Sequence, residues 1–225
     1  GSQFVARRHD DPAQHYLGRD GVHDLDSVVQ AIASQPAMAT FIAHTVATEL
    51  LGTAPDTVVA ALAAAFTAAD FDVRTLVEAT LTAGLAGTSA PIVLGPVPWL
   101  VIARRVTGAS LAAPAAQKQQ LALLRDAGQL PMYPPNVAGW PGGPAWFASG
   151  SLVARTNLAT LVARATPDGS QALVAAQGKD PAALATALAL PEPGFGAATT
   201  AALAAAPAGV QRLALALASP EMFVV

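Results

Sequence analysis

The sequence predicts an all-α fold: a compact bundle of about ten short alanine-rich helices with one long loop rich in Pro, Gly and Trp. Apolar residues recur at i, i+3 and i+4 in successive segments, as on the buried side of a helix. Proline and glycine separate these segments at distances suited to short helices. No segment alternates β-branched and polar residues as a half-buried strand does, so we expect no strand.

Helix start and stop signals place the elements of the first half of the chain. Asp and Pro favour helix N-termini, and Gly favours the position after the last turn. We expect helices from Asp24 or Asp26 through Ile32, from Pro36 to Gly52, from Thr53 or Pro55 through Phe66, from Asp72 to Gly84 or Gly87, from Trp99 to Gly108, and from Pro114 to Gly128.

The second half begins with a long loop, residues 129–148, and then returns to helices. Ser149 or Ser151 is expected to cap a helix that ends before Pro167. Further helices are expected at about 169–177, 181–190, 196–206 and 208–218, the second of them opened by Asp180-Pro181.

The expected domain organisation is a lead-in segment, residues 1–26, followed by one helical domain, residues 27–225. That domain is either undivided or made of two sub-bundles, 27–128 and 149–225, joined by the 129–148 loop. Roughly a quarter of the residues are alanine, which has the highest helix propensity and lets helix axes approach closely.

Composition excludes several classes of function. Only 12% of the residues are charged and the net charge is −3, so no basic surface for nucleic acid is expected. The chain has no cysteine, which excludes disulfides and thiol chemistry. Mean hydropathy is high at +0.44, but Pro and Gly interrupt every long uncharged stretch, so no transmembrane segment is expected.

The 129–148 loop is the first candidate site. Its aromatic side chains offer flat apolar faces with a polar atom, and its prolines stiffen the backbone. We expect it to bind a partner protein or an extracellular polymer. In the alternative interpretation the tryptophans pack inward, Asn136 satisfies backbone groups, and Arg155 and Asn157 hydrogen-bond the loop carbonyls. The candidate binding residues are Tyr133, Asn136, Trp140, Trp146, Arg155 and Asn157.

The second candidate site lies in the lead-in segment, where histidine and aspartate gather. Imidazole and carboxylate are the ligands of zinc, manganese and iron. A divalent metal held by His9, Asp10, His23 and Asp24 would make the chain a metal-assisted hydrolase. Asp10 and Asp24 are equally suited to turns and helix caps. No nucleophile elbow and no phosphate-binding glycine loop is present, so no other cofactor is expected.

Four segments carry a resemblance to a known family. The loop sequence from Gly128 to Trp146, with Arg155-Thr156-Asn157 after it, closely resembles the signature of the bacterial family called Domain of Unknown Function 1800. His9-Asp10 with Leu17-Gly18, the segment from Gln35 to Ala43, and Ser219-Pro220-Glu221-Met222-Phe223 also resemble segments of that family.

The resemblance implies a mainly helical C-terminal portion of a larger bacterial protein that is often exported. It also implies a partner, because such proteins are often encoded beside proteins that resemble sulfatases and alkaline phosphatases. The family has no established activity, so the resemblance assigns no catalytic residue. The sequence thus predicts a binding module, with the metal-assisted hydrolase as the alternative.

Overall fold

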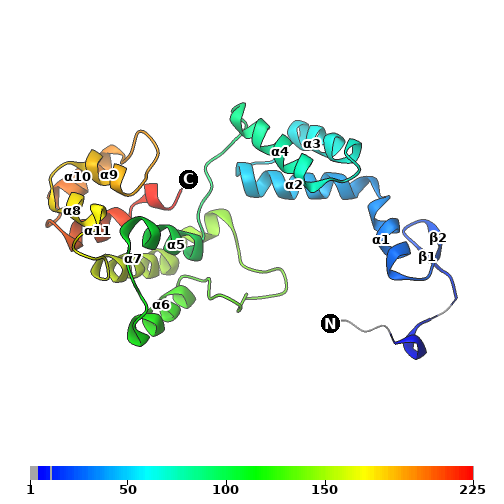
Figure 1. The fold of residues 1–225 in the computed structure, drawn as a ribbon, viewed down its shortest axis with the longest axis horizontal. Helices are drawn as coiled ribbons and strands as arrows, with labels where there is room; N and C mark the ends of the chain where they lie inside the picture. Colours follow the sequence, from blue (N-terminus) through cyan, green and yellow to red (C-terminus); the bar gives the residue numbers. More distant parts are fainter. Residues whose placement is uncertain (1–4, 11, 225) are drawn as a thin grey trace. The chain divides into compact units, whose positions relative to one another are not determined.

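The computed structural model describes residues 5–10 and 12–224 and confirms the all-α fold (Figure 1). Eleven α-helices, three short 3₁₀ helices and one two-stranded hairpin make up this described part. The chain divides into two compact units, Gly1–Pro91 and Ile92–Val225. The boundary falls in the Pro/Gly-rich stretch before Trp99, so the 129–148 loop lies within the second unit.

The first unit holds a hairpin and four helices. In chain order its elements are the 3₁₀ helix η1 (Ala6–Arg8), β1 (Gln14–Tyr16), β2 (Arg19–Val22), α1 (Leu25–Ala33), α2 (Pro36–Leu51), α3 (Asp56–Ala68) and α4 (Val73–Leu85).

The hairpin corrects the expectation that the chain has no strand. β1 and β2 are antiparallel, with Tyr16 opposite Arg19 and the two-residue turn Leu17-Gly18 between them. Both turn residues have positive φ, 50° and 77°, as in the type I′ turns that suit the twist of paired strands. Strands of three and four residues are too short to show an alternating pattern, which is why the sequence gives no strand signal.

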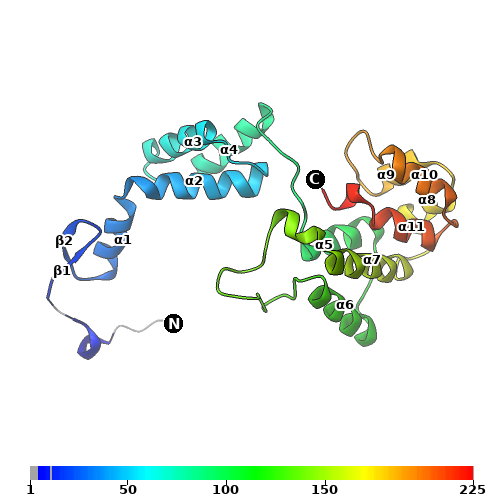
Figure 2. The same ribbon diagram turned by 180° about the vertical axis from the view of Figure 1, so that it is seen from behind.

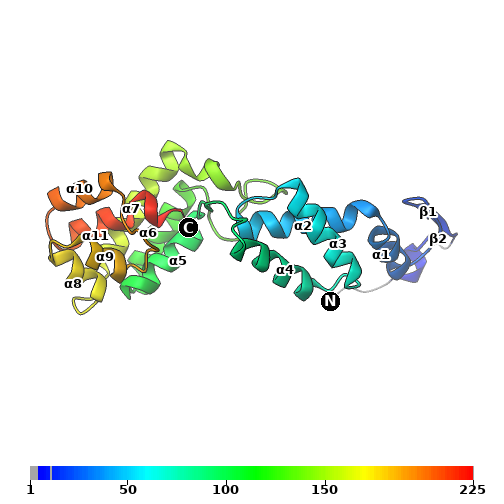
Figure 3. The same cartoon turned by 90° about the horizontal axis from the view of Figure 1, so that it is seen from above.

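Helices α2, α3 and α4 lie side by side and enclose the core of the first unit (Figures 1 and 3). Ala39, Ala43 and Ala47 form the buried side of α2, at intervals of four residues. Leu62 and Phe66 of α3 pack in the same cluster. The predicted start and stop signals are confirmed here: the Asp24 and Asp72 side chains cap α1 and α4, and Gly52 ends α2 with φ 68°.

The second unit is built around α7. Its elements are α5 (Pro96–Thr107), α6 (Pro114–Asp126), the 3₁₀ helix η2 (Gly143–Phe147), α7 (Ser149–Arg164), α8 (Gln171–Gln177), α9 (Pro181–Ala187), α10 (Ala197–Ala205), α11 (Val210–Leu217) and the 3₁₀ helix η3 (Pro220–Met222). Helices α5, α6 and α11 all pack on α7 (Figure 2). Leu158 and Val162 of α7 are completely buried in the core they share.

The start of α7 differs from the prediction. The helix begins at Ser149, but no side chain caps it, and its N-cap residue is Ala148. Ser151 lies inside the helix, is buried, and donates a hydrogen bond to the carbonyl of Ala127 (3.1 Å). It faces α6 and therefore joins two helices instead of capping one.

Arg212 of α11 holds the short C-terminal helices together. Its buried guanidinium donates to the carbonyls of Leu203, Ala206, Ala176 and Gly178, at or near the ends of α10 and α8. Carbonyl groups at helix C-termini lack intrahelical partners, so one cation satisfies several of them at once.

No single helix of the described residues is long and apolar enough to cross a membrane, although α2 and α3, bent by 118°, meet the length and hydropathy criteria as a pair.

Candidate functional site

The 129–148 loop is fixed to the helices of its unit at both ends. Its first residue, Gln129, accepts a hydrogen bond from the backbone N–H of Val97 at the start of α5 (2.8 Å). Near its last residues, the side chain of Trp146 is 5% exposed and packs beside Gly128. Gly128 has φ +88°, a conformation that favours glycine and that turns the chain out of α6 into the loop.

The two tryptophans of the loop differ in exposure. Trp146 is buried and serves as the hydrophobic attachment of the loop. Trp140 is half-buried, and its indole Nε1 is enclosed without a hydrogen-bond partner in the described part of the chain. Neither presents a fully open ring face, so the tryptophans are poorly placed to stack on a ligand from solvent.

The outer part of the loop is apolar and open to solvent. Met132 is 87% exposed, Tyr133 is 73% exposed, and Val137 is fully exposed. We call these three residues the loop tip. No charged residue occurs between Ala127 and Ala154. In Figures 1 and 2 the loop extends away from the helices that it connects, α6 and α7.

Asn136 shapes the turn beside the loop tip. Its side-chain oxygen accepts from the N–H of Ala138 (2.8 Å), and its carbonyl accepts from the N–H of Gly139 (3.1 Å). Gly139 has φ +92°, a conformation that favours glycine. This geometry agrees with the alternative interpretation of Asn136, in which it satisfies backbone groups.

Arg155 lies in the core of the second unit. Its side chain is 0% exposed and donates from Nη2 to the carbonyl of Leu94, which precedes α5. The expectation that Arg155 hydrogen-bonds the loop carbonyls is therefore wrong: α7 turns this side chain inward, toward α5. Burial lowers the pKa of Arg155 to about 10, so it stays a cation near neutral pH.

Asn157 has a different environment. It is exposed and lines an open groove of about 320 Å³ between α6 and α7, together with Asp126 and Val153. Arg155 and Asn157 are thus two residues apart in sequence but face opposite environments, the core and the solvent.

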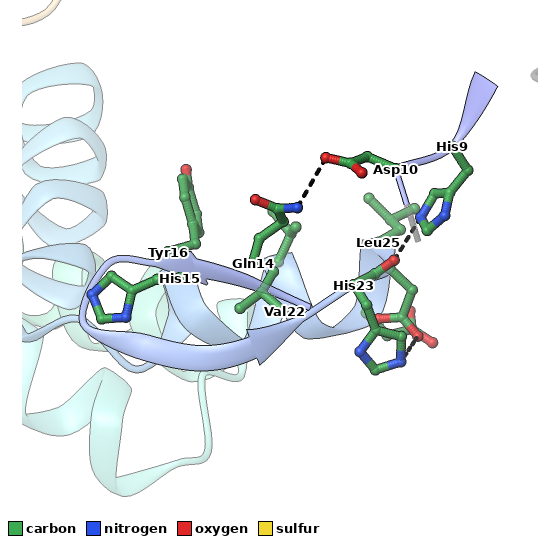
Figure 4. Close-up of a pocket in the computed structure, with 11 residues that line it drawn as sticks. His9, Asp10, Gln14, His15, Tyr16, Val22, His23 and Leu25 are labelled. Carbon is green, nitrogen blue, oxygen red and sulfur yellow. Dashed lines mark hydrogen bonds and ion pairs between the residues drawn. The ribbon is translucent and has the colours of Figure 1, made fainter. Parts of the chain in front are cut away.

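The histidines of the first unit form hydrogen bonds that do not converge on one point (Figure 4). His9 Nε2 lies 2.7 Å from the carbonyl oxygen of His23, and His23 Nδ1 lies 2.7 Å from that of Gly21. Because a carbonyl only accepts, both ring nitrogens carry a proton and donate. His15 lies at the other end of the hairpin and bonds Asp20 through Nδ1 (2.6 Å).

The predicted metal site is only partly assembled. The structure brings His9 next to His23, but among residues 5–10 and 12–224 no three His, Asp or Glu side chains are placed to hold a metal ion. Asp10 accepts from Gln14 (3.0 Å), and Asp24 caps α1. The cap role that the sequence left open as an alternative is therefore confirmed for Asp24.

The same residues line a pocket of about 730 Å³ that is open to solvent. Its lining joins His9, Asp10, His23 and Asp24 to the apolar side chains of Tyr16, Val22, Leu25 and Val28. Sequence patterns did not indicate this apolar lining, nor did they indicate Met132 and Val137 of the loop tip. Leu25 is exposed although it occupies an apolar position of α1, and no local pattern distinguishes an exposed apolar residue from a buried one.

The comparison with protein families decides the membership of the chain. The family model described as Protein of unknown function (DUF1800) matches residues 1–224. The chain belongs to the DUF1800 family. A search of curated proteins and a search of solved structures gave no match.

The four segments that resemble DUF1800 sequences have distinct structural roles in this chain. Leu17-Gly18 forms the hairpin turn, and the segment from Gln35 to Ala43 begins α2. Near the C-terminus, Glu221 accepts from the N–H of Gly196 (2.8 Å) and the Thr199 hydroxyl (3.0 Å), and so holds the start of α10. Much of the DUF1800 signature therefore maintains the fold, and the loop tip is the part that extends outward.

Proposed function

We propose that this DUF1800 chain is a non-enzymatic binding module that contacts a partner protein through the loop tip, Met132, Tyr133 and Val137. One observation carries the proposal: three large apolar side chains are exposed together on an uncharged loop that is fixed at both ends. Exposed apolar groups gain free energy when a partner removes them from water. A loop held in place loses little conformational freedom on binding.

The composition of the loop tip favours a protein over a polysaccharide. Sugars bind to flat aromatic faces, and Tyr133 is the one aromatic residue of the loop tip. Trp146 is buried and Trp140 is half-buried, so neither adds an open stacking face. Met132 and Val137 are not planar, and they suit an apolar groove on a protein surface. An extracellular polymer is therefore the second occupant to test.

We infer that the sulfatase- and phosphatase-like protein implied by the family resemblance is the first partner to examine. The experiment immobilises that protein, purified from the same source, and measures binding of this chain by surface plasmon resonance. The double variant M132S/Y133S is expected to weaken binding at least about tenfold, in the range found for interface hot spots.

The matched control is Leu85→Ser. Leu85 of α4 is as exposed as Met132 but lies in the first unit, far along the chain from the loop. The proposal predicts unchanged affinity for this variant. Equal loss in both variants, or no binding by the wild-type chain, would contradict it. Sedimentation with insoluble polysaccharide tests the polymer. If the chain binds the polysaccharide and this binding depends on Tyr133 alone, the partner is a glycan and not a protein.

A further inference from the structure

The pocket of the first unit combines an apolar floor with an acidic rim. Val22 is buried at its base, and Tyr16, Leu25 and Val28 add further apolar surface. The pocket measures about 730 Å³, a size typical of sites for small organic ligands. A ligand that fits it needs an apolar part to cover this floor.

The acidic side chains among the described residues that line the pocket are Asp10, Asp24 and Asp26, and the histidines His9, His15 and His23 line it as well. Hydrogen bonds from the hydroxyl and backbone N–H of Ser27 lower the pKa of Asp24, so this carboxyl is ionised near neutral pH. No arginine or lysine is among the described lining residues. The rim therefore attracts positive charge.

The rim also presents hydrogen-bond acceptors. His23 donates its Nδ1 proton to Gly21, so in the neutral ring Nε2 carries a lone pair. That nitrogen lies 3.7 Å from Oδ2 of Asp24, which is an acceptor too. A donor group that reaches both atoms can hydrogen-bond to each of them, and a positively charged N–H group forms the strongest hydrogen bonds of this kind.

We propose that this pocket binds an organic cation, an ammonium or guanidinium group carried on an apolar stem. The stem covers Leu25 and Val28, and the cation lies among the carboxylates of the rim. This site is separate from the loop tip and belongs to the other unit, so the two proposals succeed or fail independently.

Isothermal titration calorimetry of the full chain with hexylammonium near neutral pH tests the proposal. We expect saturable binding, with methylammonium at least about tenfold weaker because it lacks the stem, whose burial contributes about 0.8 kcal/mol per CH₂. Hexanol and hexanoate, of equal length but neutral or negative, are expected not to bind detectably. A short peptide with one lysine, compared with free hexylammonium, shows whether the cation is peptide-borne or a free amine.

Matched variants separate the pocket from general attraction by a negative protein. Asp26→Asn removes one rim charge at an exposed side chain and is expected to weaken hexylammonium binding about fivefold. Asp24→Asn with Asp26→Asn is expected to weaken it further, and asparagine still caps α1. Asp56→Asn makes the same change of charge at an exposed residue in the first turn of α3 that does not line the pocket, and binding should stay within about twofold.

Several results would overturn the proposal: no binding of hexylammonium, equal binding of hexanoate, equal binding of methylammonium, or equal weakening by Asp56→Asn and Asp26→Asn. Circular dichroism confirms that each variant is folded. If the double variant unfolds, Asp26→Asn alone decides, because the Asp26 carboxylate has no hydrogen-bond or ion-pair partner within residues 5–10 and 12–224.

Discussion

The guanidinium of Arg155 lies over the ring of Phe223, with its central carbon 4.7 Å from the ring centroid. The same guanidinium donates to the carbonyl of Leu94, and Leu94 in turn donates its backbone N–H to the carbonyl of Phe223 (2.8 Å). Trp99 packs edge to face against the same Phe223 ring, with 5.8 Å between the ring centroids. One cation thus joins α7 to the residues before α5 and to the C-terminal segment.

Replacing Arg155 tests whether its charge or its volume matters more. Nε and Nη1 of this buried cation have no hydrogen-bond partner in the described part of the chain, so desolvation of the charge is incompletely offset. We expect Arg155→Met, which fills a similar volume, to change the free energy of unfolding by less than about 1 kcal/mol. Arg155→Ala leaves a cavity and should cost about 3 kcal/mol. Urea unfolding measures both, and equal losses would show that the hydrogen bond and the charge dominate.

The two tryptophans of the loop should contribute unequally to stability. Trp146→Ala removes a buried ring and is expected to lower the free energy of unfolding by about 3 kcal/mol. Trp140 is half-buried, so Trp140→Ala should cost about half as much. Urea unfolding followed by circular dichroism compares them without relying on indole fluorescence. A larger loss for Trp140→Ala would mean that the loop is attached through that residue instead.

Gly128 is predicted to be intolerant of a side chain because of its backbone and not because of crowding. It has φ +88°, while a Cβ at this position would meet the Trp146 ring at an ordinary 3.7 Å. Gly128→Ala should therefore cost about 1 kcal/mol from strain alone. Gly142 is the matched control in the same loop, since its φ is −125° and a Cβ there meets nothing within 4 Å. Equal urea midpoints for the two variants would contradict this account.

Helix boundaries could be predicted from the sequence because their causes are local. The side chain of Asp72 reaches an N–H three residues ahead, and Gly108 ends α5 through its own positive φ. Asp180 and Pro181 begin α9 in the same way. Each of these features depends on a few neighbouring residues, which a sequence shows directly.

The features that the sequence did not reveal depend on contacts between distant residues. Arginine is usually an exposed residue, but Arg155 is buried against the carbonyl of Leu94, 61 residues away. Arg212 is buried against the carbonyls of Ala176 and Gly178, 36 and 34 residues away. The pocket of the first unit requires His9 to reach the carbonyl of His23, fourteen residues away. Local patterns singled out the 129–148 loop and the lead-in segment as candidate sites, but they could not say which side chains face inward.

Glu221 supports the start of α10, and this contribution should depend on pH. Burial of its carboxyl opposes ionisation, but hydrogen bonds from the N–H of Gly196 and the hydroxyl of Thr199 outweigh that effect and lower the pKa of Glu221 below its usual value. A carboxyl whose pKa is lower in the folded state takes up its proton first in the unfolded chain. The stability that it provides is therefore complete above the unfolded pKa and is lost as pH falls through the folded pKa.

The test compares the wild-type chain with Glu221→Ala by urea unfolding near neutral pH and again at about pH 3, below the usual pKa of glutamate. Near neutral pH the variant should be less stable by about 1 kcal/mol, the usual cost of losing a helix N-terminal acceptor. At the acidic pH the difference should shrink, because the unfolded chain then takes up a proton at this carboxyl more readily than the folded chain does. Glu221→Gln keeps an acceptor oxygen without the charge, so its free energy of unfolding near neutral pH should lie between those of the wild-type chain and Glu221→Ala. A difference that grows on acidification would show that Glu221 is stabilised in its protonated form.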